Sequence, residues 1–150
     1  MPQITKIELH LETGDLSGAG TDGDVYLGIC GREFSIDSTR DDFERGSGRT
    51  YVLGEEADIR NADVNDPRKQ RLFTENVPNF PVYIRFQPRS RSDHWQLQRA
   101  DVRFNGSLHI DWDTLPFVIN DGDGEEGIWL GVRSGLFVHL VNVSHGPTVG

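Results

Sequence analysis

The stretch T-G-D-L-S-G-A-G-T-D-G-D-V-Y-L-G-I-C, residues 13–30, decides how the fold is assigned. Its first half consists of glycine, aspartate and small polar residues, a composition typical of a loop. Its second half, from Val25 to Cys30, has the apolar and aromatic content of a buried strand. Residues 4–12, just before the stretch, alternate apolar and polar side chains as a half-buried strand does. The sequence here therefore predicts two strands joined by a long acidic, glycine-rich loop.

The rest of the chain continues this pattern of short strands and turns. Strands are expected at residues 33–36, 50–53, 81–86, 95–104 and 108–112, the last after an Asn105-Gly106 turn, with one or two further hairpins within 127–142. Residues 37–48 are expected to form a polar loop with one helical turn around residues 42–45. Residues 54–79 are expected to form a long loop, also with one helical turn. About eight to eleven short strands favour an antiparallel β-sandwich.

Length, charge and cysteine content limit the class of protein. The 150 residues suit one domain, and the net charge of −9 disfavours nucleic acid, because phosphate would be repelled. The single cysteine, Cys30, rules out an internal disulfide and is interpreted as a small core residue. No run approaches the roughly 18 apolar residues of a membrane-spanning helix. The first residues lack a secretory signal pattern, so a cytoplasmic location is favoured and a secreted one stays open.

Acidic residues gather at three places that resemble the parts of a cation site. Asp22 lies in the glycine-rich loop, Asp41, Asp42 and Glu44 lie in the next long loop, and Asp93 directly precedes a predicted strand. Calcium takes six to eight oxygen ligands in flexible geometry, and such loops offer both carboxylates and backbone carbonyls. The alternative is that each is a solvated acidic turn. The segment 120–126 has part of the EF-hand order but lacks its glycine and helices, so an acidic turn is expected there.

Taken in order, several of these segments resemble the PLAT domain, the module shared by polycystin, lipoxygenase and alpha-toxin. The resemblance rests on Thr13-Gly14, residues 18–22 and 25–27, D-F-E-R-G at residues 42–46, and Trp95-x-Leu97. It covers roughly residues 3–112. It implies an all-β, eight-stranded antiparallel PLAT-type β-sandwich over residues 1–112, with residues 113–150 as a C-terminal β-hairpin extension packed on the same domain.

The resemblance also implies a function and a set of site residues. Members of the family are usually non-catalytic modules that bind calcium, membrane lipid or a partner protein. The positions matching their calcium ligands are Gly20, Thr21, Asp22, Asp41, Asp42, Glu44 and Asp93. Lipid or partner contacts are expected from Leu16, Arg89 and Arg91. Because the matching loops carry no aromatic tip, contact with lipid headgroups is expected rather than insertion into the bilayer.

The sequence thus predicts a calcium-dependent module that docks on lipid headgroups or on a protein, without chemistry of its own. A first alternative is a protein-interaction domain of the same fold, in which a metal is only structural. A second alternative is a small hydrolase in which His94 acts as a general base, which would need a deep pocket at that histidine.

Overall fold

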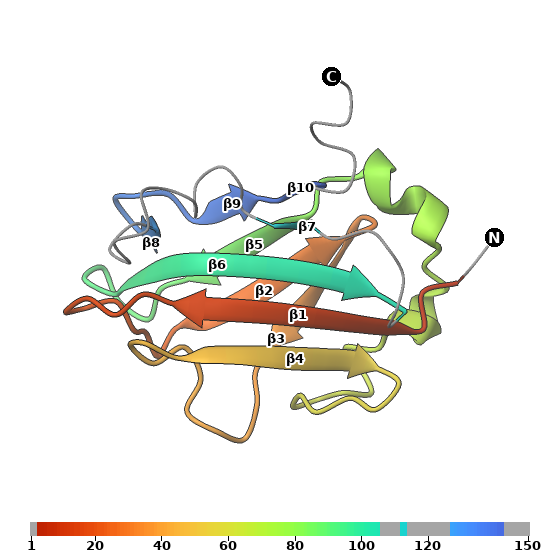
Figure 1. The fold of residues 1–150 in the computed structure, drawn as a ribbon, viewed down its shortest axis with the longest axis horizontal. Coiled ribbons are helices and arrows are strands. Elements are labelled where there is room, and N and C mark those ends of the chain that lie inside the picture. The colour runs from red at the N-terminus through yellow and green to blue at the C-terminus, as the bar shows by residue number, and fades with distance from the viewer. Residues whose placement is uncertain (1–2, 106–111, 114–126, 143–150) are drawn as a thin grey trace.

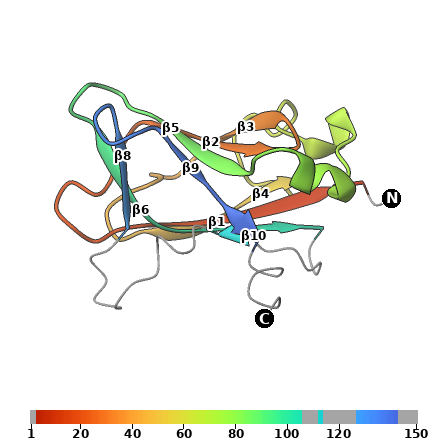
Figure 2. The ribbon, with the colours of Figure 1, turned by 90° about the horizontal axis from the view of Figure 1, so that it is seen from above.

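The computed structural model describes residues 3–105, 112–113 and 127–142, and this part of the chain is an antiparallel β-sandwich (Figures 1 and 2). The strands are β1 (Lys6–Thr13), β2 (Asp24–Ile29), β3 (Arg32–Ile36), β4 (Gly48–Gly54), β5 (Tyr83–Gln87), β6 (His94–Phe104), β7 (Trp112–Asp113), β8 (Ile128–Gly131), β9 (Phe137–His139) and β10 (Val141–Asn142). Two 3₁₀ helices, η1 (Pro67–Gln70) and η2 (Thr74–Asn79), connect β4 to β5. The predicted all-β class is confirmed.

The strands form two sheets. One runs in the order β10-β7-β6-β1-β4, with β8 paired to another part of β6, and the other runs β3-β2-β5-β9. The central strand β1 is antiparallel to both neighbours, so that Leu9 lies opposite Tyr51 on one side and Val102 on the other.

The core lies between the sheets because strand residues alternate in direction. Along β1, Ile7, Leu9 and Leu11 are buried, while the intervening polar residues are only partly covered. A fully buried side chain of this kind stabilises the fold by about 1.5–3 kcal/mol. The sequence alternation that predicted β1 is thus the burial pattern of the folded strand.

Trp95 anchors the core close to the end where β1 finishes. It is fully buried, and its ring centroid lies 5.4 Å from that of Phe43 and 5.8 Å from that of Phe86. Its indole Nε1 donates a hydrogen bond of 2.8 Å to Thr13 Oγ1. The loops that follow β1 and β3 therefore start from a rigid base.

Local backbone geometry differs from the sequence predictions at three places. The helical turn expected around residues 42–45 is absent, because Phe43 has a φ of 61°, in the left-handed region. Residues 54–79 contain two 3₁₀ helices where one helical turn was expected. The β2–β3 hairpin turns at Cys30 and Gly31, both with positive φ as two-residue hairpins prefer, rather than one residue later.

Segments after residue 126 contribute to both sheets. β8 pairs with the start of β6, and β9 pairs with β5 at the edge of the other sheet. Of the strand expected at residues 108–112, only Trp112 lies within the described residues, and the expected acidic turn at 120–126 lies outside them. Among the described segments, no helix is long and apolar enough to cross a membrane.

Candidate functional site: loops at one end of the sandwich

Three loops with predicted site residues meet at one end of the sandwich. They are the β1–β2 loop (residues 14–23), the β3–β4 loop (residues 37–47) and the β5–β6 loop (residues 88–93). Pairing places them together, since Asp24 at the start of β2 lies opposite Gln87 at the end of β5. Figure 1 shows the β1–β2 and β5–β6 loops at its left end.

Thr21 connects all three loops. Its side-chain Oγ1 donates a 2.6 Å hydrogen bond to Asp93 Oδ1, and its backbone N–H donates to the Phe43 carbonyl at 3.0 Å. The other carboxylate oxygen of Asp93 accepts a hydrogen bond from the backbone N–H of Arg89 at 2.8 Å. Thr21 and Asp93 therefore hold the loops against one another.

Two glycines allow the backbones to approach this closely. A Cβ atom on Gly20 would lie 2.7 Å from the Arg45 nitrogen, and one on Gly23 would lie 2.7 Å from the Gln87 carbonyl oxygen. Both distances are shorter than real Cβ contacts. Gly20 and Gly23 of the G-A-G-T-D-G run are thus required by packing between loops.

The loops enclose two adjoining surface hollows that share Thr21, Asp22 and Arg89. The larger, of about 600 Å³, is lined by Gly20, Thr21, Asp22, Glu44, Arg45, Arg89, Ser90 and Asp93. The smaller, of about 260 Å³, is lined by Thr21, Asp22, Gly23, Asp24, Asp37, Arg40, Asp41, Asp42, Phe43 and Arg89. The seven predicted metal positions therefore lie around one pair of hollows, although no single hollow includes all of them.

The donor set of these hollows suits a hard cation. The carboxylates of Asp22, Asp41 and Glu44 are on exposed residues and make no hydrogen bond or ion pair with the described part of the chain. They are oxygen donors, which calcium prefers. Within the described residues, however, no three His, Cys, Asp or Glu side chains are close enough to form a metal-binding group. The chemistry fits calcium, and the side chains do not form a closed cage.

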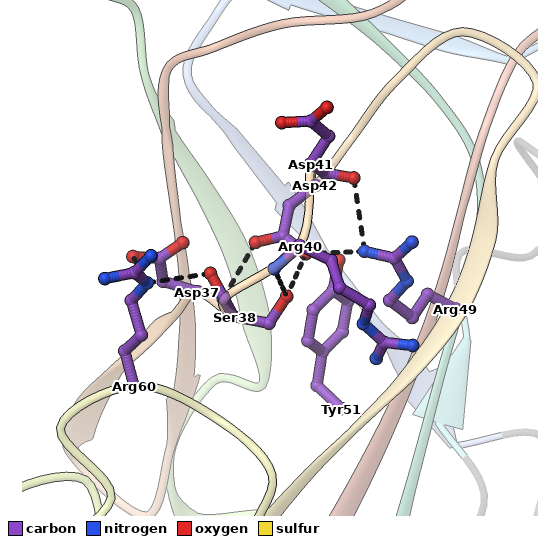
Figure 3. Close-up of polar contacts among 8 residues, drawn as sticks. All are labelled: Asp37, Ser38, Arg40, Asp41, Asp42, Arg49, Tyr51 and Arg60. Atoms are coloured by element: carbon purple, nitrogen blue, oxygen red, sulfur yellow. Dashed lines mark hydrogen bonds and ion pairs between the residues drawn. The ribbon is translucent and has the colours of Figure 1, made fainter.

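Asp42 has a different environment from its neighbour Asp41 (Figure 3). Its side chain is 6 % exposed and accepts hydrogen bonds from the Ser38 N–H at 2.8 Å, the Ser38 hydroxyl at 2.7 Å, Arg49 Nη1 at 2.9 Å and the Tyr51 hydroxyl at 2.9 Å. The Asp41 carboxylate points away from this network. In this structure Asp42 is thus occupied with donors from its own loop and from β4.

The pKa values of this cluster reflect the same contacts. Burial favours a higher pKa for Asp42, but hydrogen bonds from Ser38 and Tyr51 outweigh it and lower the pKa below its usual range. Partial burial and the adjacent Asp42 charge raise the pKa of Asp37, although Arg60 opposes this effect. Burial and Asp42 also raise the pKa of the Tyr51 hydroxyl strongly.

The predicted lipid or partner contacts also lie at this end. Arg89 lines both hollows, Arg91 is exposed in the same loop, and Leu16 is partly buried in the β1–β2 loop. His94 lies on the surface, with its ring edge-on to Trp129 at 6.4 Å, and lines neither hollow.

Sequence reasoning missed several members of the site. Asp24, Asp37 and Arg40 line the smaller hollow, and Arg45 binds Asp15 in the β1–β2 loop through its Nε at 3.1 Å. All four residues lie within a few positions of the predicted calcium ligands. Closeness in the chain was therefore the only feature of the sequence that could have indicated them.

Comparison of the sequence with known proteins finds relatives of part of the chain. No family model matches. The chain is 34 % identical over 112 residues to phospholipase C of Paraclostridium bifermentans, a match that covers 69 % of this chain and 24 % of that enzyme. It is 38 % identical over 58 residues to the human lipoxygenase homology domain-containing protein 1, covering 35 % of this chain and 3 % of that protein. The chain thus spans about a quarter or less of these relatives.

Solved structures extend the likeness to most of the chain. The alpha-toxin of Clostridium absonum superposes with a TM-score of 0.61 at 20 % identity, over 93 % of this chain and 32 % of the toxin chain. Coral 8R-lipoxygenase, described as activated by calcium through a C2-like domain, superposes with a TM-score of 0.55 at 17 % identity, over 91 % of this chain and 17 % of the enzyme. The likeness therefore concerns one β-sandwich domain of each enzyme. These matches, together with the sheet topology, show that the chain has the fold of a PLAT-type β-sandwich domain.

Proposed function

We propose that the chain is a non-catalytic docking module that binds calcium at the three loops and then binds a membrane surface or a partner protein. The observation that carries the proposal is the pair of hollows lined by Asp22, Asp41 and Glu44, whose carboxylates have no donor among the residues that the structure describes. A divalent cation there would relieve the repulsion between them. The matched segment of the toxin and of the lipoxygenase is a β-sandwich domain, which supports a binding role.

The seven predicted metal positions divide into two roles in this proposal. Asp22, which lines both hollows, supplies oxygens to a bound ion together with Asp41 in the smaller hollow or Glu44 in the larger one, and with the carbonyls of the glycine-rich loop. Asp93 and Thr21 hold the loops together through their own hydrogen bond. Asp42 stabilises the β3–β4 loop through the hydrogen bonds that its buried carboxylate accepts. When bound, calcium supplies positive charge, which these residues position at the loop end.

Calcium titration by calorimetry on chelator-treated protein tests this proposal. Wild type should release saturable heat, and Asp22→Asn and Asp41→Asn should each reduce or abolish it, because each removes one charged ligand. Asp63→Asn is the matched control, since Asp63 is an exposed aspartate that lines neither hollow. Saturation at about one hundred times the dissociation constant should add about 2.7 kcal/mol of stability. That corresponds to about 5–10 °C in melting temperature for a domain of this size.

Two other results would contradict parts of this proposal. If millimolar calcium gives neither heat nor a melting shift, the carboxylates form a solvated rim, and the proposal of a calcium module fails. A protein-interaction domain would then be the better description. If calcium binds but vesicles of phosphatidylcholine and phosphatidylserine never co-sediment with the protein, docking on a protein remains and docking on lipid is excluded.

A further inference from the structure

The turn between β8 and β9, residues 132–136, exposes apolar side chains at the same end of the molecule as the candidate calcium loops. Val132 is 52 % exposed and Leu136 is 37 % exposed, and the first residue of β9, Phe137, is 53 % exposed. Trp129 on β8 is also 37 % exposed. Large apolar side chains gathered at one tip of a protein are typical of an interaction surface.

The pairing of the strands establishes where this turn lies. Gly131 at the end of β8 is opposite His94, the first residue after the β5–β6 loop, and the Leu136 carbonyl accepts a hydrogen bond of 2.8 Å from the Phe86 N–H. Figures 1 and 2 both show the β8–β9 turn beside the β5–β6 loop at the left end. The apolar turn therefore extends the surface that carries Arg89 and Arg91.

The turn is held in place rather than loosely attached. The Gly131 N–H donates to the Gly135 carbonyl at 2.9 Å, and the Ser134 N–H donates to the Gly131 carbonyl at 3.2 Å. The Phe137 ring packs edge-on against Tyr83, with 5.4 Å between centroids. Because the apolar residues are already ordered, little conformational entropy is lost when they enter another phase.

The charges around the turn indicate which apolar phase it suits. Arg133 lies exposed at the centre of the turn, and Arg89 and Arg91 lie exposed in the neighbouring loop. Arginines beside exposed aliphatic and aromatic residues match an anionic bilayer surface, where cations meet headgroup phosphates and apolar tips enter the region below. An exposed tryptophan is likewise typical of the membrane interface.

We propose that the β8–β9 turn inserts Val132, Leu136 and Phe137 into the surface of a bilayer containing anionic phospholipid. The inference rests on the proposed docking function and names its partner. It adds to the sequence-based expectation of headgroup contact an apolar tip that comes from the last hairpin and not from the loops that resemble calcium-binding positions. Calcium at the three loops and insertion by the turn would act side by side on one membrane.

Vesicle co-sedimentation with paired variants tests the proposal. Vesicles of phosphatidylcholine and phosphatidylserine are mixed with wild type, with Val132→Ser/Leu136→Ser, and with Val64→Ser, in calcium and in chelator. Val64 is a valine near β3 that is 64 % exposed, somewhat more than Val132, and its neighbour Asn65 binds Ser35, so it serves as a control away from the turn. Each apolar side chain that leaves water contributes about a factor of ten to partition. The double variant should therefore bind vesicles at least about tenfold more weakly, with its calcium heat and melting temperature unchanged.

A fluorescent reporter on the turn gives an independent readout. Ser134→Cys in a Cys30→Asn background carries an environment-sensitive dye; asparagine tolerates the φ of 54° at position 30. The emission should shift to the blue on anionic vesicles and be quenched by lipid-borne nitroxides.

The possible results separate this proposal from the one before it. If the double variant binds vesicles as strongly as wild type and the dye on the turn stays in water, insertion by the turn is overturned. Calcium-dependent docking at the three loops is left intact by that result. Calcium heat without any vesicle binding overturns insertion and favours a protein partner. Vesicle binding that needs the turn but not calcium supports insertion and removes the calcium step.

Discussion

The Asp42 network predicts a specific loss of stability when its carboxylate is replaced. Asp42→Asn keeps the shape of the side chain but removes the charge, and an amide nitrogen in place of Oδ1 is a donor facing the hydroxyls of Ser38 and Tyr51. Both partners are buried, at 4 % and 2 % exposure, so their donors lack water as a substitute. Arg49 is 24 % exposed and can turn to solvent, so it should contribute little.

The expected magnitude follows from these contacts. A buried donor left without its acceptor costs about 1–3 kcal/mol. Two such donors, partly compensated by the remaining amide oxygen, predict about 2–3 kcal/mol for Asp42→Asn, or about 5–10 °C in melting temperature. Asp42→Ala, which removes every acceptor, should cost about 3–5 kcal/mol.

Urea denaturation followed by fluorescence of the buried Trp95 measures the effect, with Asp41→Asn as the control. Asp41 is adjacent and exposed, and only its backbone carbonyl joins the network, through Arg49, so replacing its side chain should change stability by less than about 0.5 kcal/mol. A cycle that combines Asp42→Asn with Tyr51→Phe should show a coupling of about 1 kcal/mol. Equal stabilities for Asp42→Asn and Asp41→Asn would refute the reasoning.

The same network predicts a pH dependence. Because the pKa of Asp42 is lowered on folding, its contribution is complete above the unfolded value of about 3.9 and is lost as pH falls through the lower folded value. The difference in stability between wild type and Asp42→Asn should therefore shrink below about pH 4. A difference that stays constant down to pH 2 would show that charge is not what the network requires.

Three further outcomes are expected. Asn105 has a φ of 56°, and its Oδ1 accepts hydrogen bonds from the backbone N–H groups of Thr5 and Lys6. Asn105→Ala should therefore lower the free energy of unfolding by about 2–3 kcal/mol in urea melts. A change of less than about 1 kcal/mol would contradict this role. Burial raises the pKa of Cys30 to about 11. Iodoacetamide should therefore alkylate Cys30 at pH 8 at least about a hundredfold more slowly in the folded protein than in the urea-unfolded protein. Comparable rates in the two states would contradict its burial. Folding raises the pKa of Asp37, so the fold loses stability as pH rises and this carboxyl ionises. At pH 7, Asp37→Asn should therefore melt at the same temperature as wild type or at a higher one. A clear drop in melting temperature would show that the ion pair between Asp37 and Arg60 dominates.

Local patterns were sufficient to predict the strands and the loops that carry the acids. The alternation of Ile7, Leu9 and Leu11 has the period of a strand, so β1 could be located from residue types alone. Glycine and aspartate between two such strands mark a loop for reasons that act within a few residues. Phe43 packs against Trp95 and Tyr51 with a left-handed backbone, which its own sequence neighbourhood does not indicate, and so the predicted helical turn was wrong.

The tertiary structure decided which acids are free and which are occupied. Asp41 and Asp42 are adjacent in the chain and equivalent in type, yet of the two carboxylates only that of Asp42 meets Arg49 and Tyr51, because β4 returns beneath the loop at that point. The place of the β8–β9 turn likewise depends on the pairing of β8 with β6 and of β9 with β5. Such registers join residues far apart in sequence, and they are set by the packing of the whole core rather than by local preference. Sequence alone thus identified a PLAT-type sandwich with an acidic end, and the folded arrangement revealed the apolar tip beside it.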